Sequence, residues 1–154
     1  MRYLVVMALF ILGSCNDDDT TPVQAGPKTL ADSLELEIDK AHITGMGKMG
    51  QLTRYQQYTS RLRDSISALP NAARAGLTTY KNQLDSLQLS LDYAEKAMDK
   101  WMSEFKADSL KENENSHQSY MITEKTKVDK MLEAMLTSIR TADSLLPIGQ
   151  KNKK

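Results

Sequence analysis

The 154-residue sequence has a single cysteine, one tryptophan, two histidines and a formal net charge of +0. Without a second cysteine no disulfide forms within the chain, so packing alone must stabilise the fold. The balanced charge provides no basic excess for binding phosphates, and we therefore predict no nucleic-acid partner. The scarcity of histidine and cysteine leaves no evident catalytic pair, and we expect no enzyme. A chain of this length accommodates one domain.

Long apolar runs are also rare, and the clearest one lies close to the start of the chain. It extends from Tyr3 to Leu12, follows Met1-Arg2 and ends in Leu12-Gly13-Ser14-Cys15. Ten residues are too few to span a bilayer as a helix but suit a signal peptide, and the small residues before Cys15 resemble a lipobox. We predict that residues 1–14 are removed and that Cys15 carries a covalent lipid such as palmitate, with more than one acyl chain. The alternative is an ordinary secretory signal that leaves Cys15 free.

Residues 15–27 read as a flexible acidic tether, because they are polar, contain Asp17-Asp18-Asp19 and include two prolines. The acidic run after the cysteine resembles the surface-export signal of Bacteroidota lipoproteins. We therefore predict a lipid-anchored outer-membrane protein that is exposed at the cell surface, with the periplasmic face as the alternative. Residues 148–154 contain three lysines and are predicted to be a basic, disordered tail.

Three segments of residues 28–147 carry apolar residues at alternating spacings of three and four, which align side chains on one face of a helix. The most regular row is Leu77, Tyr80, Leu84, Leu87, Leu91, Ala94, Met98, Trp101 and Phe105. Pro70, the polar stretch 108–116 and Pro147 separate the segments. We predict helices at about 28–69, 71–107 and 116–146 in an all-α, elongated, up-down-up three-helix bundle that resembles a coiled coil. Suitable N-caps are Asn71 for the second helix and Asn115 or Ser116 for the third.

Two short motifs suggest enzymes but fail in context. The stretch Gly45-Met46-Gly47-Lys48-Met49-Gly50 matches the dinucleotide fingerprint G-x-G-x-x-G, yet helical periodicity surrounds it and no strand precedes it. We therefore predict no nucleotide. The stretch Ser103-Glu104-Phe105-Lys106 matches S-x-x-K of penicillin-recognising enzymes without its companion motifs. On a helical wheel Gly45 lies on the apolar face of the first helix, the seam along which the helices would pack, and leaves room there for a bulky neighbour. Gly47 and Gly50 lie on the opposite face.

Histidine and methionine are concentrated in one layer of the predicted bundle. Folding the chain at Pro70 and at residue 111 places His42 near Trp101 and gathers soft side chains around them. The candidate ligands are His42, Met46, Met49, Met98, Met102 and Met121. Thioethers and imidazole suit Cu(I) or haem iron, but methionine beside an aromatic ring more commonly fills core gaps. We expect core packing and no cofactor, with a copper or haem site as the alternative.

Six of the twelve aspartates precede serine or threonine, and an aliphatic residue or threonine follows each pair. This pattern resembles the O-glycosylation sequon of Bacteroidota. The candidate acceptors are Thr20, Ser33, Ser65, Ser86, Ser109 and Ser144. The alternative is that such triplets arise where a polar helix edge meets the apolar seam.

Three stretches of the chain resemble one known family. They are Ala41-His42-x-x-x-Met46-x-Lys48-Met49-Gly50, Ala97-Met98-x-x-Trp101-Met102-x-x-Phe105 and Glu124-Lys125-x-Lys127-Val128. They are similar to small Bacteroidota lipoproteins labelled "viral A-type inclusion protein", a label that reflects coiled-coil similarity. The resemblance covers about residues 30 to 146 and implies a helical envelope protein without assigning an activity. Members tend to have acidic residues after the histidine, where this chain has Ile43-Thr44-Gly45.

Three functional hypotheses follow from these patterns. The first is a non-enzymatic lipoprotein, tethered to the membrane through its lipid, whose helical bundle acts as a structural or interaction module for a protein partner. The second is a soft-metal or haem binding module. The third is a homo-oligomer whose seams pair between chains.

Overall fold

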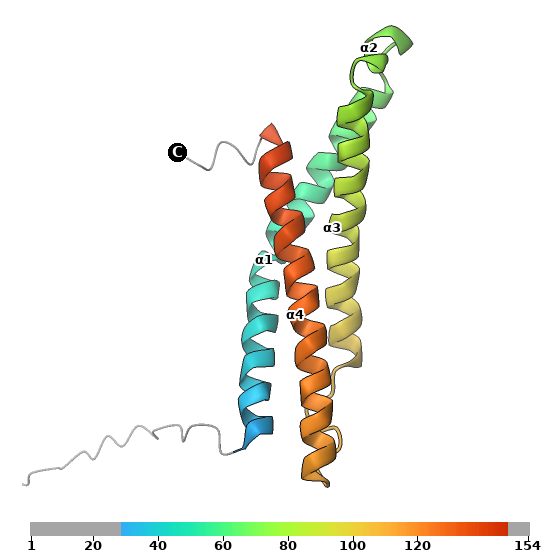
Figure 1. The fold of residues 1–154 in the computed structure, drawn as a ribbon. Helices are drawn as coiled ribbons and strands as arrows, with labels where there is room; N and C mark the ends of the chain where they lie inside the picture. The colour runs from blue at the N-terminus through green and yellow to red at the C-terminus, as the bar shows by residue number, and fades with distance from the viewer. Residues whose placement is uncertain (1–28, 148–154) are drawn as a thin grey trace, which may run out of the picture.

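The computed structural model describes residues 29–147 and confirms the predicted all-α bundle, with no strand among these residues. Helix α1 is Leu30–Ser67, α2 is Asn71–Ala75, α3 is Thr78–Glu104 and α4 is Glu114–Leu145. Helices α1, α3 and α4 pack against one another in an elongated, up-down-up arrangement (Figure 1). The predicted signal peptide, Cys15, the tether and the C-terminal tail lie outside the described residues. No helix of this described part is both long and apolar enough to cross a membrane.

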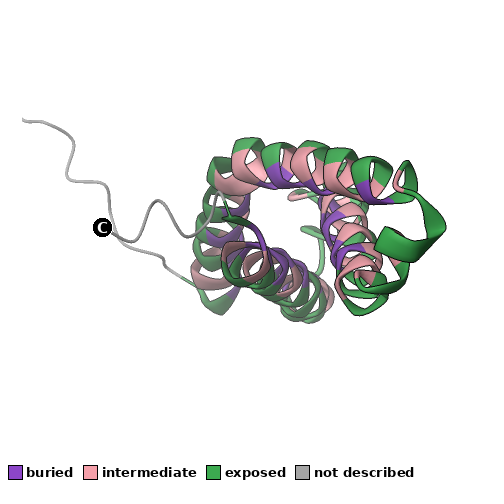
Figure 2. Cartoon of the chain, turned by 90° about the horizontal axis from the view of Figure 1, so that it is seen from above, coloured by how far each residue is buried: buried purple, intermediate pink, exposed green. Residues whose placement is uncertain are grey.

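The predicted seams form the core. On α3, Leu84, Leu91 and Met98 are fully buried, as the heptad row predicted, and Ile38 and Leu52 of α1 are fully buried as well. The buried faces of the helices point inward and the exposed faces point to solvent when the bundle is seen from above (Figure 2). The three seams therefore pack against one another within one chain.

Side-chain caps set where two of the helices begin. The Thr29 hydroxyl accepts a hydrogen bond from the Asp32 N–H at 3.1 Å, and the Asp32 carboxylate accepts one from the Thr29 N–H at 3.0 Å. This capping box starts α1 at Leu30. The prediction of Asn115 or Ser116 as the cap of the last helix is wrong. The Asn113 side chain accepts a hydrogen bond from the Ser116 N–H at 3.0 Å, so α4 begins two residues earlier than predicted.

The prediction of one continuous helix over 71–107 is also wrong, since α2 and α3 are separate. The carbonyl oxygen of Arg74 accepts hydrogen bonds from the N–H groups of both Gly76 and Leu77, so the regular helical ladder stops there. Glycine has a low helix propensity, which makes Gly76 a favourable place for the break. Asn71 was predicted as a cap but is the first residue of α2, and Pro70 is the N-cap of that helix.

The hairpin formed by α1 and α3 is longer than α4. Near the end of α4, the Asp143 carboxylate accepts a hydrogen bond from the Tyr55 hydroxyl of α1. Helix α1 continues from there to Ser67, and the hairpin projects past the end of α4 (Figure 1). We call residues 58–83 the hairpin tip.

Candidate functional site

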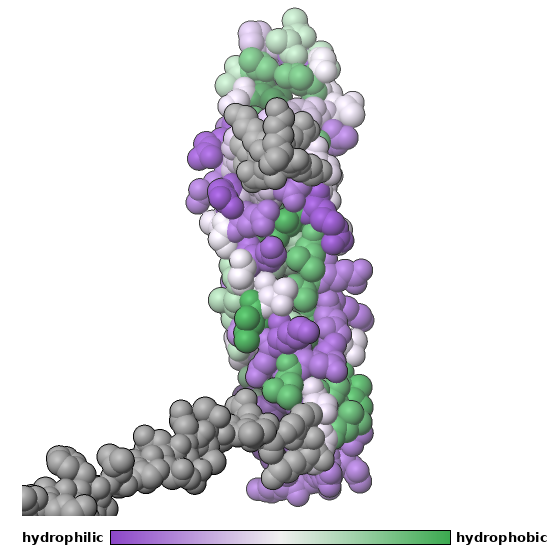
Figure 3. All heavy atoms as spheres, turned by 90° about the vertical axis from the view of Figure 1, so that its left-hand side faces the viewer, coloured by the Kyte–Doolittle hydropathy of each residue, from purple (hydrophilic) through white to green (hydrophobic). Residues whose placement is uncertain are grey.

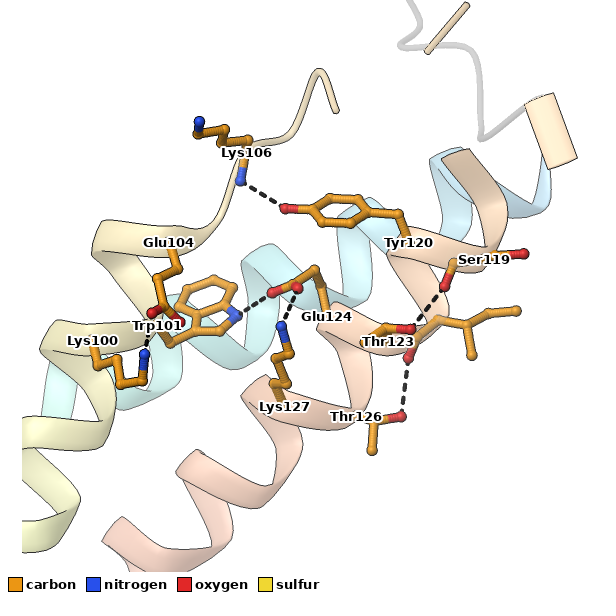
Figure 4. A network of polar contacts seen from close by, with 11 residues as sticks. Lys100, Trp101, Glu104, Lys106, Ser119, Tyr120, Thr123, Glu124, Thr126 and Lys127 are labelled. Atoms are coloured by element: carbon orange, nitrogen blue, oxygen red, sulfur yellow. Dashed lines mark hydrogen bonds and ion pairs between the residues drawn. The ribbon is translucent and has the colours of Figure 1, made fainter. Parts of the chain in front are cut away.

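A buried polar network joins the end of α3 to the first half of α4. The indole Nε1–H of Trp101 donates a hydrogen bond to Oε2 of Glu124 at 3.0 Å, and the Lys127 ammonium donates one to Oε1 at 2.7 Å (Figure 4). Trp101 is 6% exposed and Glu124 is 3% exposed. A carboxylate in a protein core is costly unless it is paired and hydrogen-bonded. These two donors therefore account for the burial of Glu124.

Charge pairing extends this network to the surface. Hydrogen bonding to Glu124 raises the pKa of Lys127 above its usual 10.5. On α3, Lys100 forms an ion pair with Glu104, and this hydrogen bond lowers the pKa of the Glu104 carboxyl. Both pKa shifts favour the charged forms of Lys127 and Glu104 at neutral pH.

The Trp101 ring is also part of a row of aromatic rings. The ring centroids of His42 and Trp101 are 5.4 Å apart, those of Trp101 and Phe105 are 4.9 Å apart, and those of Phe105 and Tyr120 are 6.4 Å apart. The Tyr120 hydroxyl accepts a hydrogen bond from the backbone N–H of Lys106 at 2.9 Å. The row connects α1, α3 and α4 and holds the start of the α3–α4 connection.

The connection is also held by His117, which is 8% exposed. Its Nδ1 lies 2.7 Å from the carbonyl oxygen of Ser109, a geometry in which the Nδ1–H tautomer donates. Leu110, which follows Ser109 in the chain, has φ = 62°, a left-handed conformation that is uncommon for residues other than glycine. The contact with His117 therefore stabilises a turn that its own sequence does not favour.

A shallow groove of about 560 Å³ runs beside the network. Two of its hydroxyl groups have partners within the chain: Ser119 donates to the Asn115 carbonyl at 2.9 Å, and Thr123 donates to the Ser119 carbonyl at 3.0 Å. Both Glu124 oxygens are bonded as well. We call Trp101, Glu124 and Lys127 the polar clamp, because their hydrogen bonds hold α3 and α4 together at this end of the bundle.

The candidate soft ligands differ in their access to solvent. The predicted contact between His42 and Trp101 is confirmed. Met98 and Met121 are fully buried, Met46 and Met102 are 43% and 37% exposed, and Met49 is half-buried. Among residues 29–147, no group of three His, Cys, Asp or Glu side chains could hold a metal ion.

One of these methionines has a defined packing role. A Cβ added to Gly45 would lie 2.3 Å from the terminal methyl of Met98, and the Met135 sulfur would lie 3.9 Å away. Gly45 therefore makes room for Met98 in the core, as the wheel predicted. Apart from the nearby backbone of α1 itself, a Cβ at Gly47 or Gly50 would meet no atom of residues 29–147 within 4 Å, which confirms that these two glycines face outward.

The glycosylation candidates lie in different environments, with Thr20 outside the described residues. The hydroxyl groups of Ser33, Ser65 and Ser144 donate to backbone carbonyls four residues earlier. Ser86 is exposed on α3 and lines, together with Ser144, a groove of about 680 Å³ between α3 and α4. Ser109 lies in the α3–α4 connection.

The sequence-based reasoning missed Glu124 and His117 as core residues, although a signal was present. In the last helix, the apolar residues at spacings of four and three begin at Val128 and continue with Leu132, Met135 and Ile139. Continued backward in steps of four, three and four, this row reaches Glu124, Met121 and His117, all of which are buried. Because Glu124 and His117 are polar, a search for apolar residues does not find them, although they continue the spacing of the buried face.

The fold and this network define a three-helix α-helical bundle with a polar clamp at one end. Comparisons with protein-family models, with curated proteins and with solved structures found no match. The resemblance to small Bacteroidota lipoproteins therefore stays a prediction.

Proposed function

We propose that the chain is a non-enzymatic, lipid-anchored protein of the cell envelope whose helical bundle serves as an interaction module. The lipid on Cys15 would hold it to the outer membrane, at the cell surface or else at the periplasmic face. The observation that carries the proposal is the position of the two ends of the bundle. Thr29, which the tether would precede, lies at one end of the elongated bundle, and the hairpin tip lies at the other (Figure 1).

The polar clamp supports this proposal. Trp101 and Lys127 bind both oxygens of Glu124, and the hydroxyls of Ser119 and Thr123 are bonded to the backbone. Such a site stabilises the end nearest the tether rather than offering free groups for chemistry. The hairpin tip is then the part of the elongated bundle that lies farthest from the lipid anchor.

The test is the behaviour of Cys15→Ala in the native organism. We expect the wild-type chain in the outer-membrane fraction and the variant outside it, with Ser14→Ala as a matched control that keeps a small residue before the cysteine. A Cys15→Ala variant that remains membrane-bound like the wild type would contradict lipid anchoring. Digestion of the wild-type chain by protease added to intact cells would place it at the surface, and protection would place it at the periplasmic face.

A soft-metal or haem site at the methionine layer is a second candidate. One observation favours it: Nε2 of His42 is buried and has no hydrogen-bond partner among residues 29–147. Trp101 is the only tryptophan and contacts His42, so its fluorescence reports on this layer. Quenching at stoichiometric Cu(I) that is lost in His42→Ala would support the site, and identical titrations of the two proteins would reject it.

A further inference from the structure

The hairpin tip lacks the third helix that covers the same seam lower in the bundle. Positions 80, 87, 94 and 101 of α3 repeat every seven residues and occupy one row. Leu87, Ala94 and Trp101 in this row are 1%, 0% and 6% exposed, whereas Tyr80 is only half-buried. Leu87 lines one groove together with Leu145, the last residue of α4. Tyr80 lies one heptad beyond that level, where α4 has ended.

Helix α1 shows the same change. Tyr55, which is bonded to Asp143 of α4, is 3% exposed, but Leu62, one heptad further on, is half-buried, as is Tyr58. Tyr58, Leu62 and Tyr80 are all partly buried side chains that pack against the core. Burial first, and then the charge of Tyr58, raise the pKa of the Tyr80 hydroxyl. Hydrophobic side chains gather at the upper end of the face drawn in Figure 3, over the tip. A partly covered apolar strip thus continues the line of α4.

Charge is segregated along the sequence, and the hairpin tip is basic. Residues 58–83 contain four basic residues and one acidic residue, a net charge of +3. Residues 40–84 contain seven basic residues and one acidic residue, a net charge of +6. Residues 29–39 contain four acidic and no basic residues, a net charge of −4, and residues 85–147 contain eight basic and twelve acidic residues, also −4. The overall neutrality of the chain conceals this separation.

Two arginines border the apolar strip and are available to a partner. Arg54, Tyr58 and Arg61 lie at i, i+4 and i+7, on one face of α1. The Arg61 guanidinium lies 6.0 Å from the centre of the Tyr58 ring. Both arginines are exposed, and neither forms an ion pair with another residue of the described range 29–147. Arg63, in contrast, is paired with Asp85 at 2.5 Å.

We propose that the hairpin tip binds an acidic amphipathic helix of a partner protein, seated on α1 and α3 along the line that α4 follows lower down. The inference rests on the proposed function as an interaction module and names its partner class. Apolar residues on the inner face of that helix would contact Tyr58, Leu62 and Tyr80, and carboxylates along its edge would bind Arg54 and Arg61. Tyrosine and arginine are the residue types that often dominate binding energy in such contacts.

The charges disfavour the two other occupants. A second copy docked tip to tip would bring two regions of net positive charge together, and like charges in an interface are unfavourable. The chain's own residues 148–154 contain three lysines and no acidic residue, so their charge does not complement the tip either.

The test uses the full chain, produced with its own N-terminal leader and purified in mild detergent. The probe is a labelled synthetic peptide about four helical turns long, with leucines at spacings of three and four and glutamates beside them. Its controls are a peptide with every glutamate replaced by lysine and one with the same composition but scrambled leucines. We expect the probe to bind at least about tenfold more tightly than either control in fluorescence anisotropy.

Variants locate the binding. Arg61→Glu should weaken probe binding by about tenfold or more, whereas Lys130→Glu, the same charge change on an exposed residue of α4, should leave it unchanged. Equal affinity for the scrambled peptide, or equal loss in both variants, would overturn the inference in favour of a general polyanion surface. A concentration-dependent dimer in sedimentation that is lost in Leu62→Glu would assign the tip to a second copy instead.

These outcomes are separate from those of the proposed function. A chain that is lipidated at Cys15 but does not bind the probe would reject the acidic-helix inference alone. A chain that binds the probe but carries no lipid would support the inference and reject the anchor.

Discussion

Trp101 of α3 and Glu124 of α4 are joined by a 3.0 Å hydrogen bond between two side chains that are both buried. The only tryptophan of the chain is thus tied to a carboxylate in the core, with the exposed Lys127 as its counter-ion. Three-helix bundles can be built from apolar seams alone, and this polar contact fixes which turns of α3 and α4 face each other.

We predict that Glu124→Leu lowers the free energy of unfolding by about 2–3 kcal/mol, because the Trp101 Nε1–H is left buried without an acceptor. Glu124→Gln keeps an acceptor and should cost less. Urea unfolding followed by circular dichroism measures both. A double-mutant cycle with Trp101→Phe should show that the two effects are coupled, and simple additivity would mean that the bond contributes nothing specific.

Gly45→Leu should destabilise the bundle by about 1–3 kcal/mol through overpacking. Any side chain at this position meets the Met98 methyl, and Leu132 and Met135 lie just behind it. Adding Met98→Ala should recover part of the loss, since it frees volume at the same place. Thermal unfolding of the single and double variants tests this, and a Gly45→Leu variant as stable as the wild type would refute the close packing.

Gly47→Ala and Gly50→Ala should each raise the free energy of unfolding by about 0.5–1 kcal/mol. Both positions are exposed within α1, and an added methyl group meets no other part of the described bundle within 4 Å. The gain comes from the lower backbone entropy of the unfolded chain and needs no new contact. Melting temperatures should therefore rise in both variants, and a fall in either one would show that its glycine is needed in the folded state.

Asp85 makes the stability of the hairpin pH-dependent. Hydrogen bonds from Lys81 and then Arg63 lower the pKa of its carboxyl below the usual 3.8. A carboxyl group whose pKa is lower in the folded than in the unfolded chain stabilises the folded state fully at pH values above its unfolded-state pKa. This contribution is lost as the pH falls through its folded-state pKa. Asp85→Asn should therefore be less stable than the wild type near neutral pH, and the two stabilities should converge in acid.

Chemical denaturation across a pH series measures this convergence. Asp99→Asn, which removes an exposed carboxylate that has no ion pair within residues 29–147, serves as the control. A constant gap between Asp85→Asn and the wild type down to acidic pH would exclude the proposed role of the ion pairs.

The helical fold was predictable because apolar periodicity reports the face that each helix buries. Leu84, Leu91 and Met98 are buried as their spacing requires, and folding the chain at Pro70 correctly places His42 beside Trp101. Helix ends were predicted less well. The cap at Asn113 is a side-chain acceptor for a backbone N–H, and the break at Gly76 is a change of backbone partner. Neighbouring residues offer competing hydrogen bonds in both places, and residue types alone do not decide which one forms.

The candidate site was only half predictable. Trp101 lies in an apolar row, but Glu124 is a charged residue whose burial depends on a partner 23 residues away in the chain. The exposure of the hairpin tip follows from a difference in helix length that appears only when α1, α3 and α4 are aligned in space. A count of charges by segment already indicates the basic region, although the total does not.

The most direct test of the central claim, a lipid-anchored envelope module, is intact-mass spectrometry of the mature chain from its native organism. The account predicts a chain that begins at Cys15 and carries the mass of a diacylglyceryl group, with a further acyl chain on its new amine. A mature chain with a free Cys15 thiol, or one that begins at another residue, would contradict it.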